Sequence, residues 1–225
     1  MQTKVVKIDP FQIDENEMKE AAELIRKGEL VAFPTETVYG LGADALHPEA
    51  SKKIYAAKGR PSDNPLIVHI CKFEELVSIA KEVPAQAEKL ADAFWPGPLT
   101  MIVWKNEKVP YETTGGMETV AIRMPKHPVA LKLIEESGCL IAAPSANTSG
   151  KPSPTEASHV KLDLDGKIPM ILDGGPVGIG IESTIIDLTE DTPMILRPGY
   201  ITKEMLEEVL GEEVKIEIGR TSCRE

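Results

Sequence analysis

The stretch PEASKKIYAAKGRPSDNPLIVHI, residues 48–70, contains a helical segment, a polar turn and an apolar run of strand length. Pro48 suits the first turn of a helix and Gly59 suits its left-handed end, so we expect a helix between them. LIVHI follows a loop that is broken by two prolines, and it predicts a buried strand. A helix that leads into a buried strand is the repeating unit of an α/β domain. The stretch therefore predicts the fold class.

The same alternation extends along the chain. Expected strands are 4–8, 29–33, 66–70, 99–104, 119–124, 139–143, 169–173, 183–188 and 193–196, and expected helices are 14–28, 48–59, 73–81, 84–94, 127–137 and 202–210. We expect one α/β domain on a mixed sheet over residues 1–200, and a C-terminal appendage or the start of a linker over 201–225. Three segments rich in Gly, Pro, Ser and Thr, at 34–47, 144–158 and 173–182, predict long loops that carry function.

The charge balance limits the classes of partner. The chain has 25 Lys and Arg against 36 Asp and Glu, which gives a net charge of −11. Broad, sequence-independent binding of nucleic acid needs a basic surface, and this balance argues against it. The Debye length is about 8 Å at physiological salt. A few cations in a cleft can therefore still attract a phosphate despite distant carboxylates.

Cysteine usage and the apolar runs indicate the compartment. Cys71, Cys139 and Cys223 are far apart and form no C-x-x-C pair, so neither a disulfide framework nor a zinc site is indicated. The first residues lack an apolar signal core, and no run approaches the roughly 20 apolar residues of a membrane span. We expect a cytoplasmic protein that does not enter a membrane.

Common catalytic motifs do not match. DGGPVGIG (173–180) has four glycines but neither a following Lys-Ser/Thr nor a following helix, so a glycine turn is the simpler interpretation and a phosphate contact the alternative. Ser145 lacks a nucleophile elbow. The four histidines show no metal-binding spacing. A covalent hydrolase and a zinc enzyme are not indicated.

What remains is a set of polar residues near strand and helix ends, each with two interpretations. Lys58 and Arg60 either interact with a helix dipole or form part of a phosphate clamp. Arg123, in the apolar strand TVAIRM, is either an edge residue or an anion receptor, and the planar guanidinium favours the receptor. Arg197 is either a surface charge or a contact to a ligand. His69 is either a core or surface histidine or a contact to a ligand. Ser145, with Asn147, is either a turn former or a contact to a ligand.

Taken together, these residues belong to motifs in a fixed order: FPTETVYGLGADA, KGRPSDNPLIVHI, FWPGPLT, TVAIRMP, APSANTSGKPSPT, ESTIIDL and LRPG. The series resembles the YrdC/TsaC family of L-threonylcarbamoyl-AMP synthases over about residues 28–199. Its K-x-R and S-x-N signatures correspond to Lys58 with Arg60 and Ser145 with Asn147.

The resemblance implies a nucleotidyltransferase that makes threonylcarbamoyl-AMP and pyrophosphate from L-threonine, bicarbonate or CO2, and ATP. The product would serve the threonylcarbamoyl modification of a tRNA adenosine, through a partner transferase, with at most transient tRNA contact here. It also implies a YrdC-like fold, with a twisted sheet and a concave, positively charged cavity. Mg²⁺ would be held mainly by the ATP phosphates, because the sequence has no carboxylate cluster for it.

The resemblance also implies roles for individual residues. The catalytic residues would be Lys58, Arg60, Ser145 and Asn147. L-Threonine would be held by Thr35, His69, Arg123, Ala143 and Ser183, and ATP by Lys58, Arg60, Ser62, Thr119, Ser145, Asn147, Ser153 and Arg197. Ala143 matches a position that often carries a hydroxyl in this family, so its contact would use the backbone or packing.

Two other functions are compatible with the sequence. A carbamoyl-adenylating domain of the hydrogenase-maturation type would use carbamoyl phosphate in place of threonine, and a non-catalytic RNA-binding module would bind tRNA without ATP turnover. Long members of the family continue through a linker with basic and tyrosine residues into a second domain. The segment from Tyr200 resembles the approach to that linker.

Overall fold

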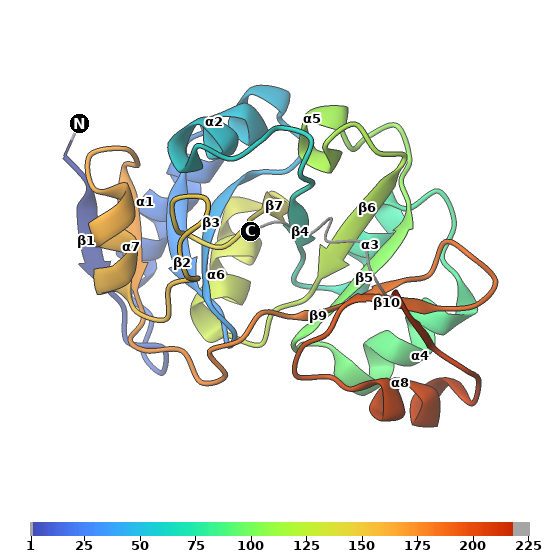
Figure 1. Ribbon diagram of the computed structural model, residues 1–225. Helices are drawn as coiled ribbons and strands as arrows, with labels where there is room; N and C mark the ends of the chain where they lie inside the picture. The colour runs from blue at the N-terminus through green and yellow to red at the C-terminus, as the bar shows by residue number, and fades with distance from the viewer. Residues whose placement is uncertain (1, 218–225) are drawn as a thin grey trace.

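The computed structural model describes residues 2–217, and within them an eleven-stranded mixed sheet forms the centre of the molecule (Figure 1). The strands lie in the order β1-β8-β2-β3-β7-β4-β6-β5-β9-β10-β11. Their bounds are β1 Lys4–Lys7, β2 Val31–Pro34, β3 Tyr39–Asp44, β4 Ile67–His69, β5 Leu99–Trp104, β6 Thr119–Arg123, β7 Ile141–Ala142, β8 Met170–Asp173, β9 Thr184–Asp187, β10 Met194–Arg197 and β11 Lys215–Ile216. The order is far from sequential, so distant segments meet in the middle of the sheet.

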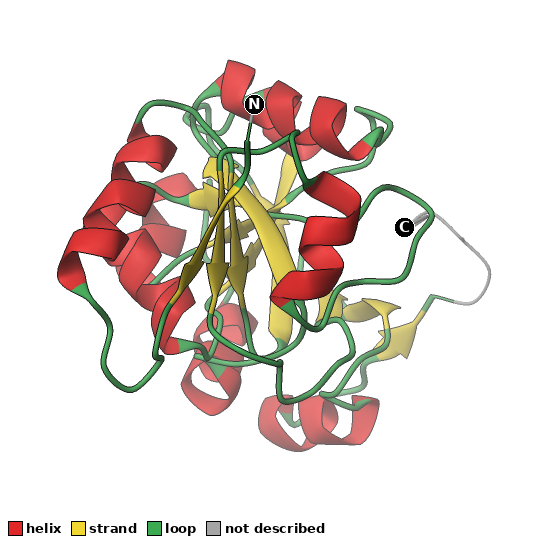
Figure 2. Cartoon of the chain, turned by 90° about the vertical axis from the view of Figure 1, so that its left-hand side faces the viewer, coloured by secondary structure: helices red, strands yellow, loops and turns green. Residues whose placement is uncertain are grey.

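Helices lie on both sides of the sheet (Figure 2). They are α1 Glu15–Arg26, α2 Pro48–Lys58, α3 Phe73–Ile79, α4 Ala85–Phe94, α5 Tyr111–Thr114, α6 Pro128–Ser137, α7 Ala157–Leu164 and α8 Lys203–Leu210. The predicted α/β class and the mixed sheet are confirmed, and each predicted helix and strand corresponds to an element in the structure.

One predicted loop is partly a strand. The segment 34–47 was expected to be irregular, yet β3 pairs antiparallel with β2 in its middle. The two glycines of YGLGAD hide this strand from a pattern based on large apolar residues. Gly42 is needed there, because a Cβ atom would lie 2.7 Å from the Phe33 ring and equally close to Ile141. The helices α5 and α7 were also not expected.

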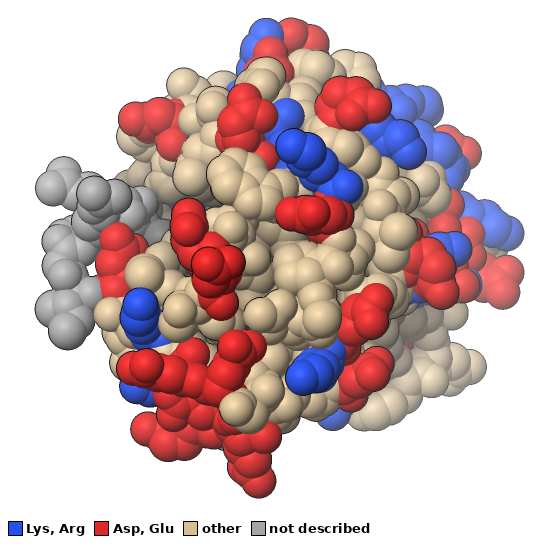
Figure 3. Space-filling model, turned by 90° about the vertical axis from the view of Figure 1, so that its right-hand side faces the viewer, with Lys and Arg blue, Asp and Glu red and all other residues tan. Residues whose placement is uncertain are grey.

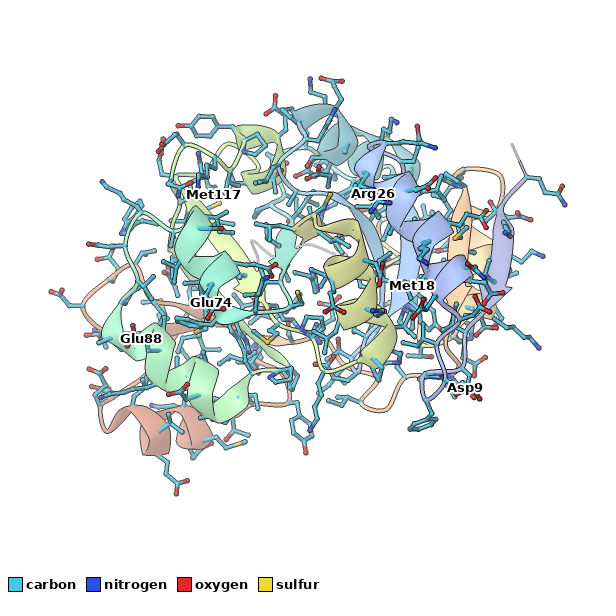
Figure 4. The ribbon with its side chains drawn as sticks, turned by 180° about the vertical axis from the view of Figure 1, so that it is seen from behind. Asp9, Met18, Arg26, Glu74, Glu88 and Met117 are labelled. Atoms are coloured by element: carbon cyan, nitrogen blue, oxygen red, sulfur yellow. The ribbon has the colours of Figure 1, made fainter. Side chains whose placement is uncertain are left out.

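The rear of the molecule is covered by α1 and α6, which lie side by side in Figure 4. Met18, labelled there on α1, is fully buried and belongs to a core cluster that includes residues of α6 and β2. Arg26, at the end of α1, donates from Nη1 to the Glu136 carbonyl of α6 at 2.7 Å. This packing stabilises the side of the sheet that faces away from α2 and α7.

The chain after residue 200 packs onto the same body. Leu206 and Leu210 of α8 are buried in the larger core cluster, and α8 contacts α4. Carboxylates, among them the exposed Glu204, Glu208 and Glu212, gather on the face that includes α8 (Figure 3). The domain boundary at 200 stays a prediction, and residues 218–225, with Cys223, lie outside the described residues. No helix within 2–217 is long and apolar enough to cross a membrane.

Candidate functional site

A cavity of about 310 Å³ lies over the centre of the sheet, and we call it the central cavity. Its lining comes from β3, β4, β5, β6, β9 and β10, and from the segments after β2, α2 and β7. The predicted site residues that line it are Thr35, Arg60, His69, Thr119, Arg123, Ala143, Ser145, Ser183 and Arg197. Lys58, Ser62, Asn147 and Ser153 are not among its lining residues. The fold thus brings together residues from all three predicted functional loops and six strands.

Arg123, on the cavity lining, is held by an ion pair with Glu36. Its Nη2 lies 2.7 Å from Glu36 Oε1, and the side chains are only 4% and 13% exposed. The two atoms interact through charge and are not aligned as a hydrogen bond. Glu36 is itself fixed, because its Oε2 accepts from the backbone N–H of Lys126 at 2.9 Å. Of the two interpretations of Arg123, the exposed edge residue is therefore wrong.

Two more contacts set the orientation of the Arg123 guanidinium. Nη1 donates to Thr37 Oγ1 at 3.0 Å, and Nε donates to the Gly97 carbonyl at 3.3 Å. Gly97 lies in the FWPGPLT motif, which presents this carbonyl after a cis Trp95–Pro96 bond. A guanidinium has five N–H groups and these two hydrogen bonds use two of them, so three remain, including both of Nη2, which lies against Glu36.

Thr35 and Thr37 have different surroundings. The Thr35 hydroxyl donates to the Val38 carbonyl at 2.7 Å and accepts from the N–H groups of Thr37 and Val38 at 3.2 Å. These bonds close a tight turn between β2 and β3. Thr37 Oγ1 lies 3.0 Å from Thr35 Oγ1 and contacts Arg123. The sequence pattern T-E-T marks both threonines, and the geometry adds Thr37 to the candidates.

His69 is 4% exposed and lies beside Arg123, its register partner across β4 and β6. Burial, followed by the charge of Arg123, lowers the pKa of His69 to about 3, so the ring is neutral at neutral pH. Nδ1 lies 3.1 Å from the Ile67 carbonyl, which can only accept, so a proton on Nδ1 is donated to that carbonyl. A neutral His69 can orient a ligand by hydrogen bonding, but it cannot supply a positive charge.

The same cavity has a second arginine–glutamate pair. Arg197 Nη1 donates to Glu182 Oε2, Nε donates to the Ser183 carbonyl at 3.0 Å, and Nη2 donates to Ser183 Oγ at 3.1 Å. Ser153 donates to Glu182 Oε1 at 2.9 Å. The Arg197 and Glu182 side chains are 23% and 25% exposed. Ser153 thus reaches this group through Glu182.

Gly199, in the LRPG motif, explains why the chain can pass so close to the Glu182–Ser183 segment. A Cβ atom at Gly199 would lie 2.6 Å from the Glu182 carbonyl oxygen and from the Thr184 nitrogen. Backbone at that distance cannot give way cheaply, so only glycine fits. The LRPG motif therefore holds Arg197 next to Glu182 and Ser183, the residues that Arg197 contacts.

Lys58 and Arg60 have opposite environments although one residue separates them. Gly59 ends α2 in the left-handed conformation, with φ of 62°. Lys58 is 1% exposed, and burial, followed by the charge of Arg60, lowers its pKa to about 7. Arg60 lines the cavity, where Nε donates to the Asn64 carbonyl at 3.4 Å and Nη2 to the Pro65 carbonyl at 3.2 Å.

The charges on the cavity lining are mixed. Three arginines, Arg60, Arg123 and Arg197, face two carboxylates, Asp63 and Glu182. The predicted positive character of the cavity stays a prediction. Residues that the sequence interpretation missed are Glu36, Thr37, Asp63, Gly97 and Glu182. Glu36 and Glu182 lie inside the motifs PTETVYG and ESTIIDL, so their position in a motif was the available signal.

The described residues, 2–217, contain no cluster of metal-binding side chains. No three His, Cys, Asp or Glu side chains are grouped there in a way that could hold a metal ion. Asp63 and Glu182 are the carboxylates of the cavity lining. Mg²⁺ commonly uses one or two carboxylates together with substrate phosphates. The lining therefore fits a cation that arrives with a polyphosphate.

The sequence and the fold of this chain are similar to those of known proteins. The profile of the Sua5/YciO/YrdC family, described as "Telomere recombination", matches residues 23–199. A protein of Pyrococcus abyssi named threonylcarbamoyl-AMP synthase is 61% identical over 201 residues, which cover 89% of this chain and 59% of that protein. One of Bacillus subtilis with the same name is 57% identical over 204 residues, which cover 90% of this chain and 59% of that protein.

A solved structure extends the match to the fold. The crystal structure of P. abyssi Sua5 complexed with L-threonine has a TM-score of 0.93 and 58% sequence identity, and the match covers 96% of this chain and 63% of that chain. The predicted YrdC-like fold is therefore confirmed. This chain spans about 59% of the length of the two curated relatives.

Proposed function

The chain belongs to the Sua5/YciO/YrdC family, and on this basis we propose that it forms L-threonylcarbamoyl-AMP and pyrophosphate from L-threonine, bicarbonate or CO2, and ATP. The observation that carries the proposal is the central cavity, because residues predicted for threonine and residues predicted for ATP line the same space. The identity to proteins named threonylcarbamoyl-AMP synthase supports the choice of substrates.

The threonine end of the cavity is the end with Arg123. Its guanidinium would bind the threonine carboxylate through the N–H groups that Glu36, Thr37 and Gly97 leave available. His69, as a neutral ring, and Ser183 would bind the polar groups of the amino acid. Ala143, which is 4% exposed, offers packing or backbone contact. In this arrangement Thr35 acts through the turn that presents Thr37.

The nucleotide end is the end with Arg60 and Arg197. These cations, with Ser145 and Thr119, would bind ATP along the lining, and Ser153 would act beside Glu182. Ser62 is exposed outside the cavity lining and would contact only a part of the nucleotide that extends beyond it. A cation about 4 Å from a phosphate charge gains on the order of 4 kcal/mol at an effective dielectric near 20, before desolvation.

The chemistry needs no enzyme nucleophile. The threonine nitrogen forms a bond to the carbon of CO2 and loses a proton, which gives a carbamate. A carbamate oxygen then forms a bond to the α-phosphorus, while the bond from that phosphorus to the bridging oxygen of the β-phosphate breaks and pyrophosphate leaves. The cavity would hold the two substrates in contact and neutralise the developing charge with fixed cations and hydrogen-bond donors.

A divalent cation belongs to this proposal as a companion of ATP. Mg²⁺, when bound, would offset negative charge on the phosphates. Asp63 and Glu182 are the carboxylates of the lining, and both oxygens of Glu182 already contact Arg197 and Ser153. We expect the protein in the cytoplasm. There the adenylate would pass to a transferase that modifies tRNA. Contact of this chain with tRNA would be transient.

The decisive experiment supplies ATP, Mg²⁺, bicarbonate and labelled L-threonine. We expect pyrophosphate and a labelled adenylate that both require threonine. Folded protein that gives neither product would overturn the proposal. Replacing threonine with carbamoyl phosphate tests the carbamoyl-adenylating alternative, and salt-dependent tRNA binding without any ATP turnover would favour the RNA-binding module.

A further inference from the structure

Lys58 is surrounded by carbonyl oxygens of the segment Ser145–Asn147. Its ammonium group donates to the Ser145 carbonyl, to the Asn147 carbonyl at 2.7 Å and to Asn147 Oδ1 at 3.4 Å. When Lys58 is protonated, its ammonium has three N–H groups and these three acceptors use its full capacity; the neutral amine has one N–H fewer. Lys58 is 1% exposed and does not line the central cavity. No donor of Lys58 remains for a phosphate in this arrangement.

The Asn147 side chain is equally engaged, and it is only 3% exposed. Its Oδ1 accepts from Lys58, and its Nδ2 donates to the carbonyls of Thr148 at 3.0 Å and Lys151 at 2.8 Å. In both the K-x-R and the S-x-N signature, one residue is buried in the protein and the other lines the cavity. Lys58 and Asn147 contact each other inside the protein, whereas Arg60 and Ser145 line the cavity.

Backbone contacts hold the same segment from both sides. The Ser149 N–H donates to the Lys58 carbonyl at 2.9 Å, and the Ala146 N–H donates to the Tyr39 carbonyl at 2.8 Å. Ser145 also forms an isolated bridge with Gly40 of β3. The segment 145–149 thus lies between α2 and β3, and the Lys58 ammonium fills the space beneath it. Burial of an ammonium is costly unless hydrogen bonds replace water, so these contacts are strongly maintained.

We propose that Lys58 is a positioning residue, which holds Ser145 at the nucleotide end of the cavity through backbone carbonyls and makes no direct contact with the phosphates. The inference rests on the proposed function, since it assigns how one element of the ATP site is held. It differs from the role that the family resemblance implies, in which Lys58 and Asn147 bind ATP directly.

A double-mutant cycle on ATP affinity tests this inference. Two contacts that act independently give fold-losses that multiply, whereas residues that act through each other do not. By isothermal titration calorimetry, we expect Lys58→Met to weaken ATP binding about tenfold or more. Ser145→Ala should cost several-fold in the native background but less than twofold in the Lys58→Met background. In the matched cycle of Arg60→Met with Ser145→Ala, the losses should multiply.

Control variants separate a loss of folding, a wrong inference and a wrong proposed function. Lys53→Met removes an exposed lysine of the same helix, and ATP affinity should change less than twofold. Lys58→Gln keeps two N–H donors without a charge, should recover part of the lost affinity, and serves in the cycle if Lys58→Met does not fold. Losses that multiply for Lys58 and Ser145, or a Lys58→Met protein with native ATP affinity, would overturn the inference. A native protein that does not bind ATP would overturn the proposed function.

Hydrogen exchange gives a readout that is independent of ATP. The amides of Ala146 and Ser149 should exchange at least tenfold faster in Lys58→Met than in the native protein, and should be unchanged in Arg60→Met. Unchanged exchange in Lys58→Met would also overturn the inference.

Discussion

The two arginine–glutamate pairs of the central cavity differ in burial. The Arg123–Glu36 pair is 4% and 13% exposed and is fixed by the backbone of Lys126, whereas the Arg197–Glu182 pair is 23% and 25% exposed. Burial makes an unpaired charge expensive, while water screens an exposed one. We therefore expect the first pair to be rigid and to contribute more to stability, and the second to exchange contacts more easily.

The largest effect is expected at Arg123. In Arg123→Ala, L-threonine affinity should fall on the order of 100-fold, because a charged hydrogen-bonded contact contributes about 1.5–3 kcal/mol. ATP affinity should change less than threefold, which titration calorimetry with each ligand can measure. Arg123→Lys keeps the charge but not the planar fork, so it should lie between the native protein and Arg123→Ala. Equal losses for threonine and ATP would contradict the role of Arg123.

Removing the charge of each glutamate tests whether the two pairs differ in stability because they differ in burial. Glu36→Gln leaves a buried arginine without its counterion, so the free energy of unfolding should fall by about 3 kcal/mol. Glu182→Gln, the matched variant in the more exposed pair, should stay within about 1 kcal/mol of the native protein. Chemical denaturation measures both. If the two variants lose the same stability, burial does not distinguish the pairs.

The pH dependence of stability should reflect His69, beside Arg123. The pKa of His69 is about 3 in the folded chain and near 6.5 in an unfolded chain, so the unfolded state binds more protons between these values. The stabilisation is complete above about pH 6.5 and is lost as the pH falls toward 3, with a loss of about 2 kcal/mol between pH 7 and pH 5.

Denaturation at a series of pH values measures this slope. His69→Gln should reduce it, while His159→Gln, at an exposed position, should leave it unchanged. Burial also lowers the pKa of His127, so some slope should persist in His69→Gln. A slope that is identical in His69→Gln and the native protein would contradict this assignment.

The smallest effect is expected at the second pair. Arg197→Gln should weaken ATP binding about tenfold, which corresponds to about 1.4 kcal/mol. Threonine affinity should change less than threefold, although Arg197 also contacts Ser183. Glu182→Gln retains the arginine and provides the control for the lost ion pair. A threonine loss larger than the ATP loss would reverse the proposed order of the two ends.

The sequence predicts the strands with large apolar residues and the helices with clear caps, because burial and capping are local properties. It did not predict β3, since Gly40 and Gly42 make close packing possible but carry no apolar signal. Among site residues, Arg123 could be recognised as an arginine in an apolar strand. Its partner Glu36 could not, because the pairing depends on which loops the sheet order brings together.

Lys58 shows the same limit. A lysine next to a helix-ending glycine looks the same in sequence whether its ammonium faces a cavity or the interior. Only the position of 145–149 relative to α2 gives it three carbonyl acceptors. Signature residues can thus be located from the sequence, but the direction of each side chain depends on contacts between distant segments.

The strand order has a consequence for the folding of the chain during synthesis. β1 pairs with β8, which places Lys4 beside Met170, and β5 pairs with β9, which places Leu99 beside Thr184. Contacts between segments so far apart in sequence form slowly, and the first strand must wait for its neighbour to leave the ribosome. The cavity, whose lining runs from Thr35 to Arg197, forms only after nearly all of this chain has been made. The capacity to bind ligand should therefore emerge late in translation and all at once.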